Sequence, residues 1–160
     1  MLERREFLAA VVGSAAPVTS TPLVGAWSLI DAVTIEPDGR SRPWNGWGPS
    51  SIGLILYEPT GLMAVQIAGP RSRQPHETEF SKLPADQRLD YLRTYYAYFG
   101  RYTFDAAQSI VTHVISSSLD PSEIGDTYRR KVDLHGDMVT LTTLDPNGPH
   151  SVLRWRRVVS

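Results

Sequence analysis

The stretch SIGLILY-EPTG-LMAVQIA, residues 51–68, decides the fold. Its first and last parts are apolar runs of strand length, and the four residues between them are common turn formers. Two such runs joined by a short turn predict a β-hairpin, in which the second strand returns antiparallel to the first. This part of the chain is therefore predicted to be antiparallel sheet.

Similar strands are predicted on both sides of this hairpin, where β-branched and aromatic residues are frequent. Turn formers separate them, among them PDG at 37–39, HGD at 135–137 and DPNGP at 145–149. Residues 84–98 differ, because their apolar side chains recur three and four positions apart, which predicts an amphipathic helix that stops at Gly100. The further predicted strands are 24–36, 101–104, 109–116, 128–134, 138–144 and 152–158.

About eight sequential strands at this spacing are typical of an antiparallel meander. Closing the meander into a barrel removes both exposed sheet edges, and such a barrel either fills with side chains or holds one small ligand. We therefore predict an all-β fold, an eight-stranded antiparallel up-and-down barrel with one inserted helix at about 84–98. Residues 22–160 would form this single domain.

Composition excludes several classes of protein and site. The 160 residues are 41% hydrophobic with a net charge of −1, which suits one globular domain and gives no basic surface for nucleic acid. The absence of cysteine excludes disulfides and thiolate metal sites, and the absence of a long apolar run predicts no membrane span. Because paired-histidine and glycine-rich phosphate motifs are missing, we expect neither a metal nor a cofactor.

The first 21 residues are predicted to lie outside the fold. Arg4 and Arg5 precede an apolar stretch, Phe7 to Val12, and small residues follow, which is the order of an export signal and resembles a twin-arginine signal. This pattern predicts a protein exported to the periplasm or the extracellular space. The alternative is an N-terminal tail on a cytoplasmic protein.

Several short segments between residues 23 and 158 carry a family resemblance. Gly25-Ala26-Trp27 is similar to the Gly-x-Trp signature of lipocalins and the wider calycin barrels. GLILYEPTG at 53–61, YFGRY at 98–102, VTH at 111–113 and LRW at 153–155 are similar to the bacterial and fungal lipocalin-like domain family. Pro121 is followed by Ser122-Glu123, where that family often has Asn-Trp, so the ligand is not carried over.

The resemblance implies a small calycin-type barrel around an apolar ligand. It implies that Trp27 closes one barrel end beneath an arginine of the last strand, with Arg154, Arg156 and Arg157 as candidates. It also favours an inward-facing His113, although apolarity alone leaves both faces of that strand open. An imidazole facing an apolar lumen would stay neutral and serve as an acid/base group, or would be a core histidine bonded to a neighbour.

Alternation along the strands supplies a cationic candidate. Arg130 shares a face with Tyr128 and Val132, whereas the alternate residues are polar, so Arg130 is predicted to point inward. A buried guanidinium needs a partner, either an internal carboxylate such as Asp105 or Glu58, or an oxygen of a ligand.

Amide, phenol and indole groups complete the predicted site. The amide of Gln66 can orient a ligand carbonyl or face solvent, and each tyrosine can bind a ligand or pack in the core. Two tryptophans in a loop rich in glycine and proline form either an aromatic lid or a loop anchor. The candidate ligand-binding residues are Trp44, Trp47, Tyr57, Gln66, Tyr98, Tyr102, His113, Tyr128 and Arg130.

Two functions from different classes fit these residues. The first is a binding protein that holds one small, largely apolar molecule in the lumen. The second is a cofactor-free isomerase, cyclase or dehydratase for a polyketide- or terpenoid-like substrate, with His113 as acid/base and Arg130 stabilising an oxyanion. A filled barrel that only binds a protein partner is a third alternative, and a homodimer is compatible with each. An open lumen favours the first two.

Overall fold

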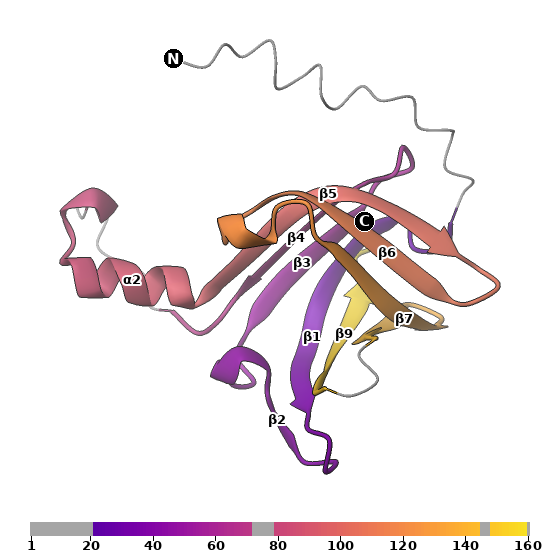
Figure 1. Cartoon of the computed structure of the whole chain (residues 1–160), viewed down its shortest axis with the longest axis horizontal. Coiled ribbons are helices and arrows are strands. Elements are labelled where there is room, and N and C mark those ends of the chain that lie inside the picture. The colour runs from indigo at the N-terminus through magenta and orange to yellow at the C-terminus, as the bar shows by residue number, and fades with distance from the viewer. Residues whose placement is uncertain (1–20, 72–78, 145–147, 160) are drawn as a thin grey trace, which may run out of the picture.

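Eight long strands form a closed antiparallel barrel in the computed structural model, which describes residues 21–71, 79–144 and 148–159 (Figure 1). Each of these strands pairs with the next, and the first pairs with the last to close the barrel. The predicted fold class is thereby confirmed. The strands are β1 (Gly25–Ile35), β3 (Ile52–Tyr57), β4 (Leu62–Ala68), β5 (Tyr95–Asp105), β6 (Ile110–Ser118), β7 (Thr127–His135), β8 (Met138–Thr143) and β9 (His150–Arg157).

The predicted hairpin forms β3 and β4, with Ile55 opposite Val65 and Tyr57 opposite Met63. These four side chains are buried inside the barrel, whereas the alternate apolar residues Ile52, Leu54, Leu56 and Leu62 lie outside and are exposed. The segment is apolar on both faces, but only one face of a strand can point into a barrel, so its other apolar side chains lie outside. Inward alternation on the other strands completes the core, which includes Trp27, Tyr98, Val111 and Trp155.

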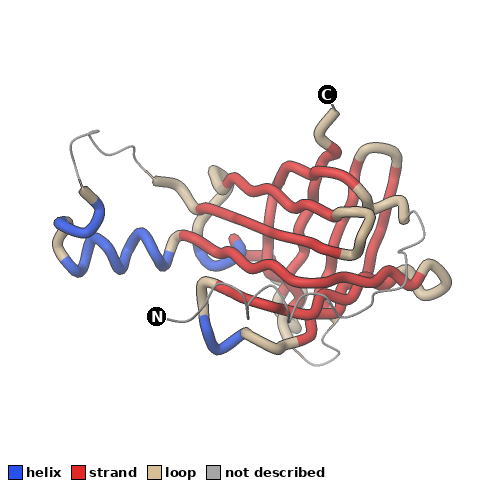
Figure 2. Tube along the Cα trace, turned by 90° about the horizontal axis from the view of Figure 1, so that it is seen from above, coloured by secondary structure: helices blue, strands red, loops and turns tan. Residues whose placement is uncertain are grey.

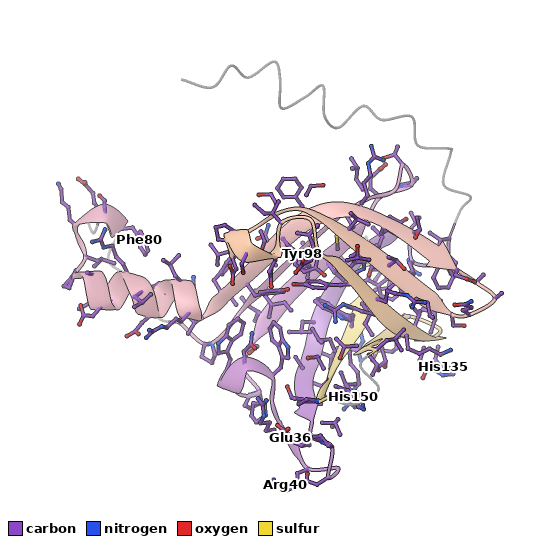
Figure 3. All side chains as sticks on the ribbon, in the orientation of Figure 1. Glu36, Arg40, Phe80, Tyr98, His135 and His150 are labelled. Atoms are coloured by element: carbon purple, nitrogen blue, oxygen red, sulfur yellow. The ribbon has the colours of Figure 1, made fainter. Side chains whose placement is uncertain are left out.

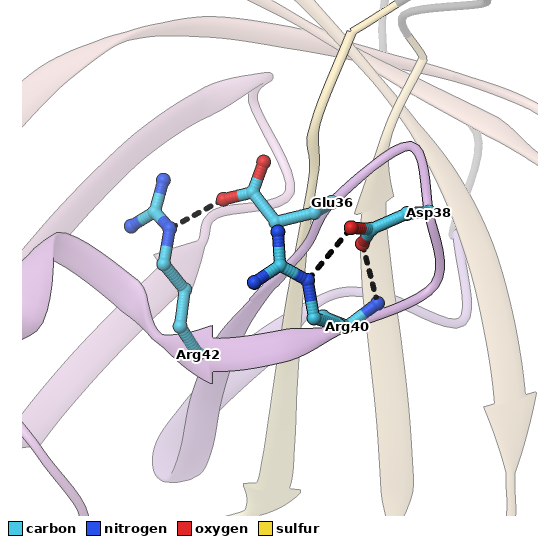
Figure 4. Close-up of polar contacts among 4 residues, drawn as sticks. All are labelled: Glu36, Asp38, Arg40 and Arg42. Carbon is cyan, nitrogen blue, oxygen red and sulfur yellow. Dashed lines mark hydrogen bonds and ion pairs between the residues drawn. The ribbon is translucent and has the colours of Figure 1, made fainter.

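A short strand, β2 (Ser41–Pro43), extends β1 as a second hairpin at the barrel margin. At its tip Arg40 pairs with Asp38 at 2.7 Å and Arg42 pairs with Glu36 at 2.5 Å (Figure 4). Exposed ion pairs of this kind contribute little to stability. They shape a turn that lies beside the loop carrying Trp44, whose residues 44–46 form the 3-10 turn η1 (Trp44–Gly46).

The inserted helix is shorter than predicted. It is α2 (Ala85–Arg93), and the residues from Tyr95 onward belong to β5. Their apolar spacing fits a helix, but it also fits a strand of alternating aromatic residues, and pairing with β4 decides in favour of the strand. The side chains of α2 are not buried, and the helix projects from the barrel in both views (Figures 1 and 2).

Trp27 closes one end of the barrel, as the resemblance implied. It is fully buried, its indole N–H donates to the carbonyl of Leu23 at 2.8 Å, and the guanidinium of Arg157 lies 4.1 Å from its ring centroid. Arg157 also donates to the carbonyls of Val24 and Pro22, at 2.8 and 2.7 Å. Arg157 is thus the arginine of the three candidates that covers the tryptophan.

The register between β5 and β6 shifts by one residue between Phe99 and Gly100. At this bulge the two backbones approach so closely that a Cβ on Gly100 would lie 2.0 Å from the carbonyl oxygen of Val114. The extra residue of this bulge is Ser116, on β6, which has no register partner on β5.

The export signal and the absence of a membrane span are two further predictions from the sequence. The predicted export signal covers residues 1–21, of which 1–20 lie outside the described residues. Within the described part of the chain, α2 and the short turns are the helical segments, and none is long and apolar enough to cross a bilayer.

Candidate ligand-binding site

The barrel interior contains a cavity of about 470 Å³, which lies within the range of roughly 300–1,000 Å³ typical of small-molecule sites. Its inner wall is apolar and comes from strands on opposite sides of the barrel. The side chains that form this wall are Ile55, Val65, Ile67, Leu141 and Leu153. The lumen is therefore open, which disfavours the alternative of a filled barrel.

A chain of aromatic rings leads from the loop after β2 into this cavity. The ring centroids of Trp44 and Tyr96 lie 5.4 Å apart, those of Tyr96 and Tyr98 lie 5.5 Å apart, and those of Tyr98 and Tyr128 lie 5.8 Å apart. All three pairs are edge-to-face, the arrangement that aromatic quadrupoles favour. Trp44 lines the cavity mouth with these tyrosines.

Trp47 packs against Trp44 and does not line the cavity. Its ring lies 5.2 Å from that of Trp44, and its indole N–H donates to the carbonyl of Arg93 at 3.1 Å. Its side chain packs so closely on Gly69 that a Cβ there would lie 2.9 Å from the indole. The sequence offered an aromatic lid or a loop anchor. Trp44 borders the cavity, as a lid residue would, and Trp47 anchors the loop.

His113 faces the interior but is sealed between two tyrosines. The hydroxyl of Tyr57 lies 2.9 Å from its Nε2, and that of Tyr98 lies 2.8 Å from its Nδ1. Burial, together with the nearby charge of Arg130, lowers the pKa of His113 to about 3. The imidazole is therefore neutral, so one phenol donates to it and the other accepts its N–H. His113 is fully buried and does not line the cavity. Tyr98, which contacts His113, does line it.

The lowered pKa of His113 predicts a measurable pH dependence of stability. Between pH 6.5 and 3 the unfolded chain binds a proton that the native imidazole does not, so stability is complete above pH 6.5 and falls as the pH decreases. The slope is about 1.4 kcal/mol per pH unit. Urea unfolding at pH 7 and pH 5 should show a loss about 2 kcal/mol larger for the wild type than for His113→Gln. Carboxylates titrate in both proteins and cancel, so equal losses would contradict the neutral, buried imidazole.

Arg130 points into the cavity from β7. Its guanidinium interacts with the phenol of Tyr98 and lies 5.7 Å from the ring centroid of Tyr128. Its Nη1 atom is buried and has no hydrogen-bond partner. The ion pairs among the described residues do not include Arg130, so the predicted pairing with Asp105 or Glu58 does not form.

Trp155 and Glu123 are among the lining residues that were not predicted from the sequence. Trp155 is 1% exposed, and its indole Nε1 is buried without a hydrogen-bond partner. Alternation along β9 would have found it, because it shares an inward face with Leu153. Glu123 lies at the cavity mouth, where its carboxylate accepts hydrogen bonds from Tyr96 at 3.3 Å and Ser118 at 2.6 Å.

Five of the nine predicted residues do not line the cavity, namely Trp47, Tyr57, Gln66, Tyr102 and His113. Gln66 is exposed on the outer face of β4, where its amide oxygen accepts from Tyr95 at 2.6 Å, so its other predicted orientation, toward solvent, is the one observed. Tyr102 packs 4.7 Å from Tyr57 in the core and donates to the carbonyl of Glu58 at 3.1 Å. Of the nine predicted residues, those that line the cavity are Trp44, Tyr98, Tyr128 and Arg130. Figure 3 shows Tyr98 within the barrel region and Phe80 far from it, beyond α2.

Comparison with known proteins gives one match to a curated protein and several to solved barrels. The chain is 31% identical over 107 residues to the 4'-hydroxy-3'-methoxypropiophenone carrier protein ppsC of Aspergillus oryzae, covering 60% of this chain and 96% of that protein. A redesigned β-barrel is similar at 14% identity and a TM-score of 0.43, covering 86% of this chain and 92% of that one. A de novo designed fluorescence-activating barrel is similar at 13% identity and a TM-score of 0.41, covering 84% and 93%.

The family itself follows from a match over most of the chain. The lipocalin-like domain matches residues 24–158, which run from the strand carrying Trp27 to the end of β9. The chain therefore belongs to the lipocalin-like domain family.

Proposed function

We propose that this protein is a carrier that binds one small aromatic molecule in its barrel. The observation that carries the proposal is the open cavity of about 470 Å³, whose lining combines an apolar inner wall with aromatic and polar side chains. The relative named as a carrier protein for an aromatic ketone supports the same class of function.

An aromatic ligand suits the side chains around the cavity. Aromatic rings line the cavity at Trp44, Tyr98 and Trp155. Aliphatic side chains, among them Val65 and Leu153, provide further apolar contacts. A planar ring can extend the existing edge-to-face chain, and each aromatic pair adds about 0.5–1.5 kcal/mol beyond its buried area.

A fluorescence titration with N-phenylnaphthylamine (NPN), a neutral aromatic dye that brightens in apolar surroundings, tests this proposal. The wild type should bind one dye molecule. Val65→Phe fills the lumen with an apolar ring and should weaken binding by about tenfold or more, because the dye loses its contact area. The matched control is Leu54→Phe, on the outer face of β3, which should bind as the wild type does. Failure of the wild type to bind, or equal binding by Val65→Phe, would contradict a lumenal site.

A second candidate function is suggested by the contact between Tyr98 and His113. A phenol that borders the cavity and is backed by a neutral imidazole can pass a hydrogen-bonded proton to a ligand oxygen, with Arg130 beside it. That arrangement favours a cofactor-free isomerase, cyclase or dehydratase acting on a polyketide- or terpenoid-like substrate. Propiophenone in D₂O provides the test, because an enzyme of this kind should exchange the α-hydrogens and Tyr98→Phe should not. Absence of exchange by the wild type favours the carrier.

We also propose that the protein is exported through its twin-arginine-like N-terminal segment. Processing should remove roughly the first 15–20 residues. Intact-mass measurement of protein purified from its own host checks this, and a cytoplasmic protein that retains Met1 would contradict it.

A further inference from the structure

The cavity has two buried N–H groups without partners. They are Nη1 of Arg130, on β7, and Nε1 of Trp155, on β9, and both residues line the cavity. A buried donor that has left water without gaining an acceptor costs about 1–3 kcal/mol, and more if it is charged. A fold that retains two such groups in one cavity has donors available for a guest.

Two of the acceptor side chains that line the cavity are already engaged in hydrogen bonds. Tyr98 is hydrogen-bonded to His113, and Glu123 accepts from Tyr96 and Ser118 at the mouth. Burial raises the pKa of Tyr98, and it raises that of Tyr128 to about 12, so these phenols remain neutral at physiological pH. The guanidinium is always protonated. The inner side of the cavity therefore presents positive charge and N–H donors.

We propose that the ligand is an organic anion, an aromatic molecule that carries a carboxylate or a comparable delocalised oxyanion. This inference rests on the proposed binding of a small aromatic molecule in the lumen. The oxyanion would accept hydrogen bonds from Arg130 and Trp155, while the ring would lie against the apolar wall that includes Val65 and Leu153.

A neutral carbonyl would meet these requirements less well than an anion. It can accept the same hydrogen bonds, but it brings no negative charge to the guanidinium of Arg130, which forms no ion pair among the described residues. An anion supplies both the acceptor and the opposite charge, and charge-assisted hydrogen bonds are roughly twice as strong as neutral ones. The cavity should therefore distinguish an acid from its neutral isostere.

Two dyes that differ by one charged group test the inference. Anilinonaphthalene sulfonate (ANS) has the same ring skeleton as NPN and adds a sulfonate. The wild type should bind ANS at least about tenfold more tightly than NPN. Arg130→Met keeps the apolar stem and should remove this preference, because it should weaken ANS binding at least about tenfold more than it weakens NPN binding. Lys131→Met is the matched control, because it removes one positive charge from the exposed face of the same strand, and it should preserve the preference.

The outcomes separate this inference from the proposed function. Binding of NPN with no preference for ANS, or an unchanged preference in Arg130→Met, overturns the anion site and leaves the carrier function intact. A wild type that binds neither dye overturns both. Equal weakening of both dyes by Arg130→Met shows a structural role for this arginine and also overturns the anion site.

A competition in the wild type needs no variant and remains decisive if Arg130→Met does not fold. Naphthoate and naphthamide have nearly the same shape, but only the first is charged at pH 7. Naphthoate should displace NPN at a concentration about tenfold or more below that of naphthamide. Equal or better displacement by naphthamide would overturn the proposal. Trp155→Phe should reduce the advantage of naphthoate, because it removes one N–H donor and keeps an aromatic ring.

Discussion

Trp27→Ala will lower the free energy of unfolding by about 3–5 kcal/mol, the range for removing a large buried aromatic side chain. Trp27 is fully buried at the closed end of the barrel. Its loss leaves a void, removes the hydrogen bond to Leu23 and exposes the stacked guanidinium of Arg157 to a cavity. Urea unfolding followed by circular dichroism measures the change.

Trp27→Phe and ligand binding provide the controls for this prediction. The phenylalanine keeps a ring beneath Arg157 and should cost clearly less than the alanine. Trp27 does not line the cavity, so NPN should bind the folded fraction of either variant as it binds the wild type. A variant that unfolds like the wild type but no longer binds the dye would place Trp27 in the site and contradict its structural role.

Gly100→Ala will destabilise the barrel by about 3 kcal/mol or more, at the upper end of the range for overpacking. The new Cβ would lie 2.0 Å from the carbonyl oxygen of Val114 and 3.0 Å from the amide nitrogen of Ser116. Both atoms belong to the backbone of β6, so a side-chain rotation cannot relieve the contact. The strands must separate at the bulge, and the hydrogen-bonded ladder between β5 and β6 is weakened.

The matched control is Gly53→Ala, in β3. Its Cβ would lie 3.1 Å from Gln66, Ile67 and Leu29, contacts that small adjustments of the neighbours can relieve. It should cost clearly less than Gly100→Ala, as measured by thermal and urea unfolding of both variants. Similar losses for the two variants would mean that loss of glycine itself, rather than the close approach of β6, explains the effect.

Much of the barrel could be predicted because its signals are local. Turn formers and alternation identified the β3–β4 hairpin, and the Gly-x-Trp pattern placed Trp27 at a barrel end. The end of the helix was wrong because the aromatic run from Tyr95 to Phe99 satisfies two periodicities at once. The choice between them depends on pairing with β4, about 30 residues earlier in the chain, which local spacing does not reveal.

The site was harder to predict because it depends on depth within the lumen as well as on orientation. Alternation correctly turned Arg130 inward. The tyrosines were left open between ligand binding and core packing, and Tyr102 packs in the core outside the cavity. Gln66 was ambiguous because its strand is apolar on both faces. The lack of a hydrogen-bond partner for Nη1 of Arg130 follows only from the three-dimensional structure, in which Glu58, just after β3, and Asp105, at the end of β5, are both exposed.

The closure of β1 on β9 has a consequence for how the protein folds. Ser28 and Arg156 meet across this seam although they are 128 residues apart in the chain. During synthesis β1 can pair with β3 early, but its other edge has no partner until the last strand leaves the ribosome. Such long-range pairing makes folding slow, and until it forms, the unpaired edge of β1 can pair with strands of other chains. Truncation before β9 should therefore yield aggregates rather than a smaller stable barrel.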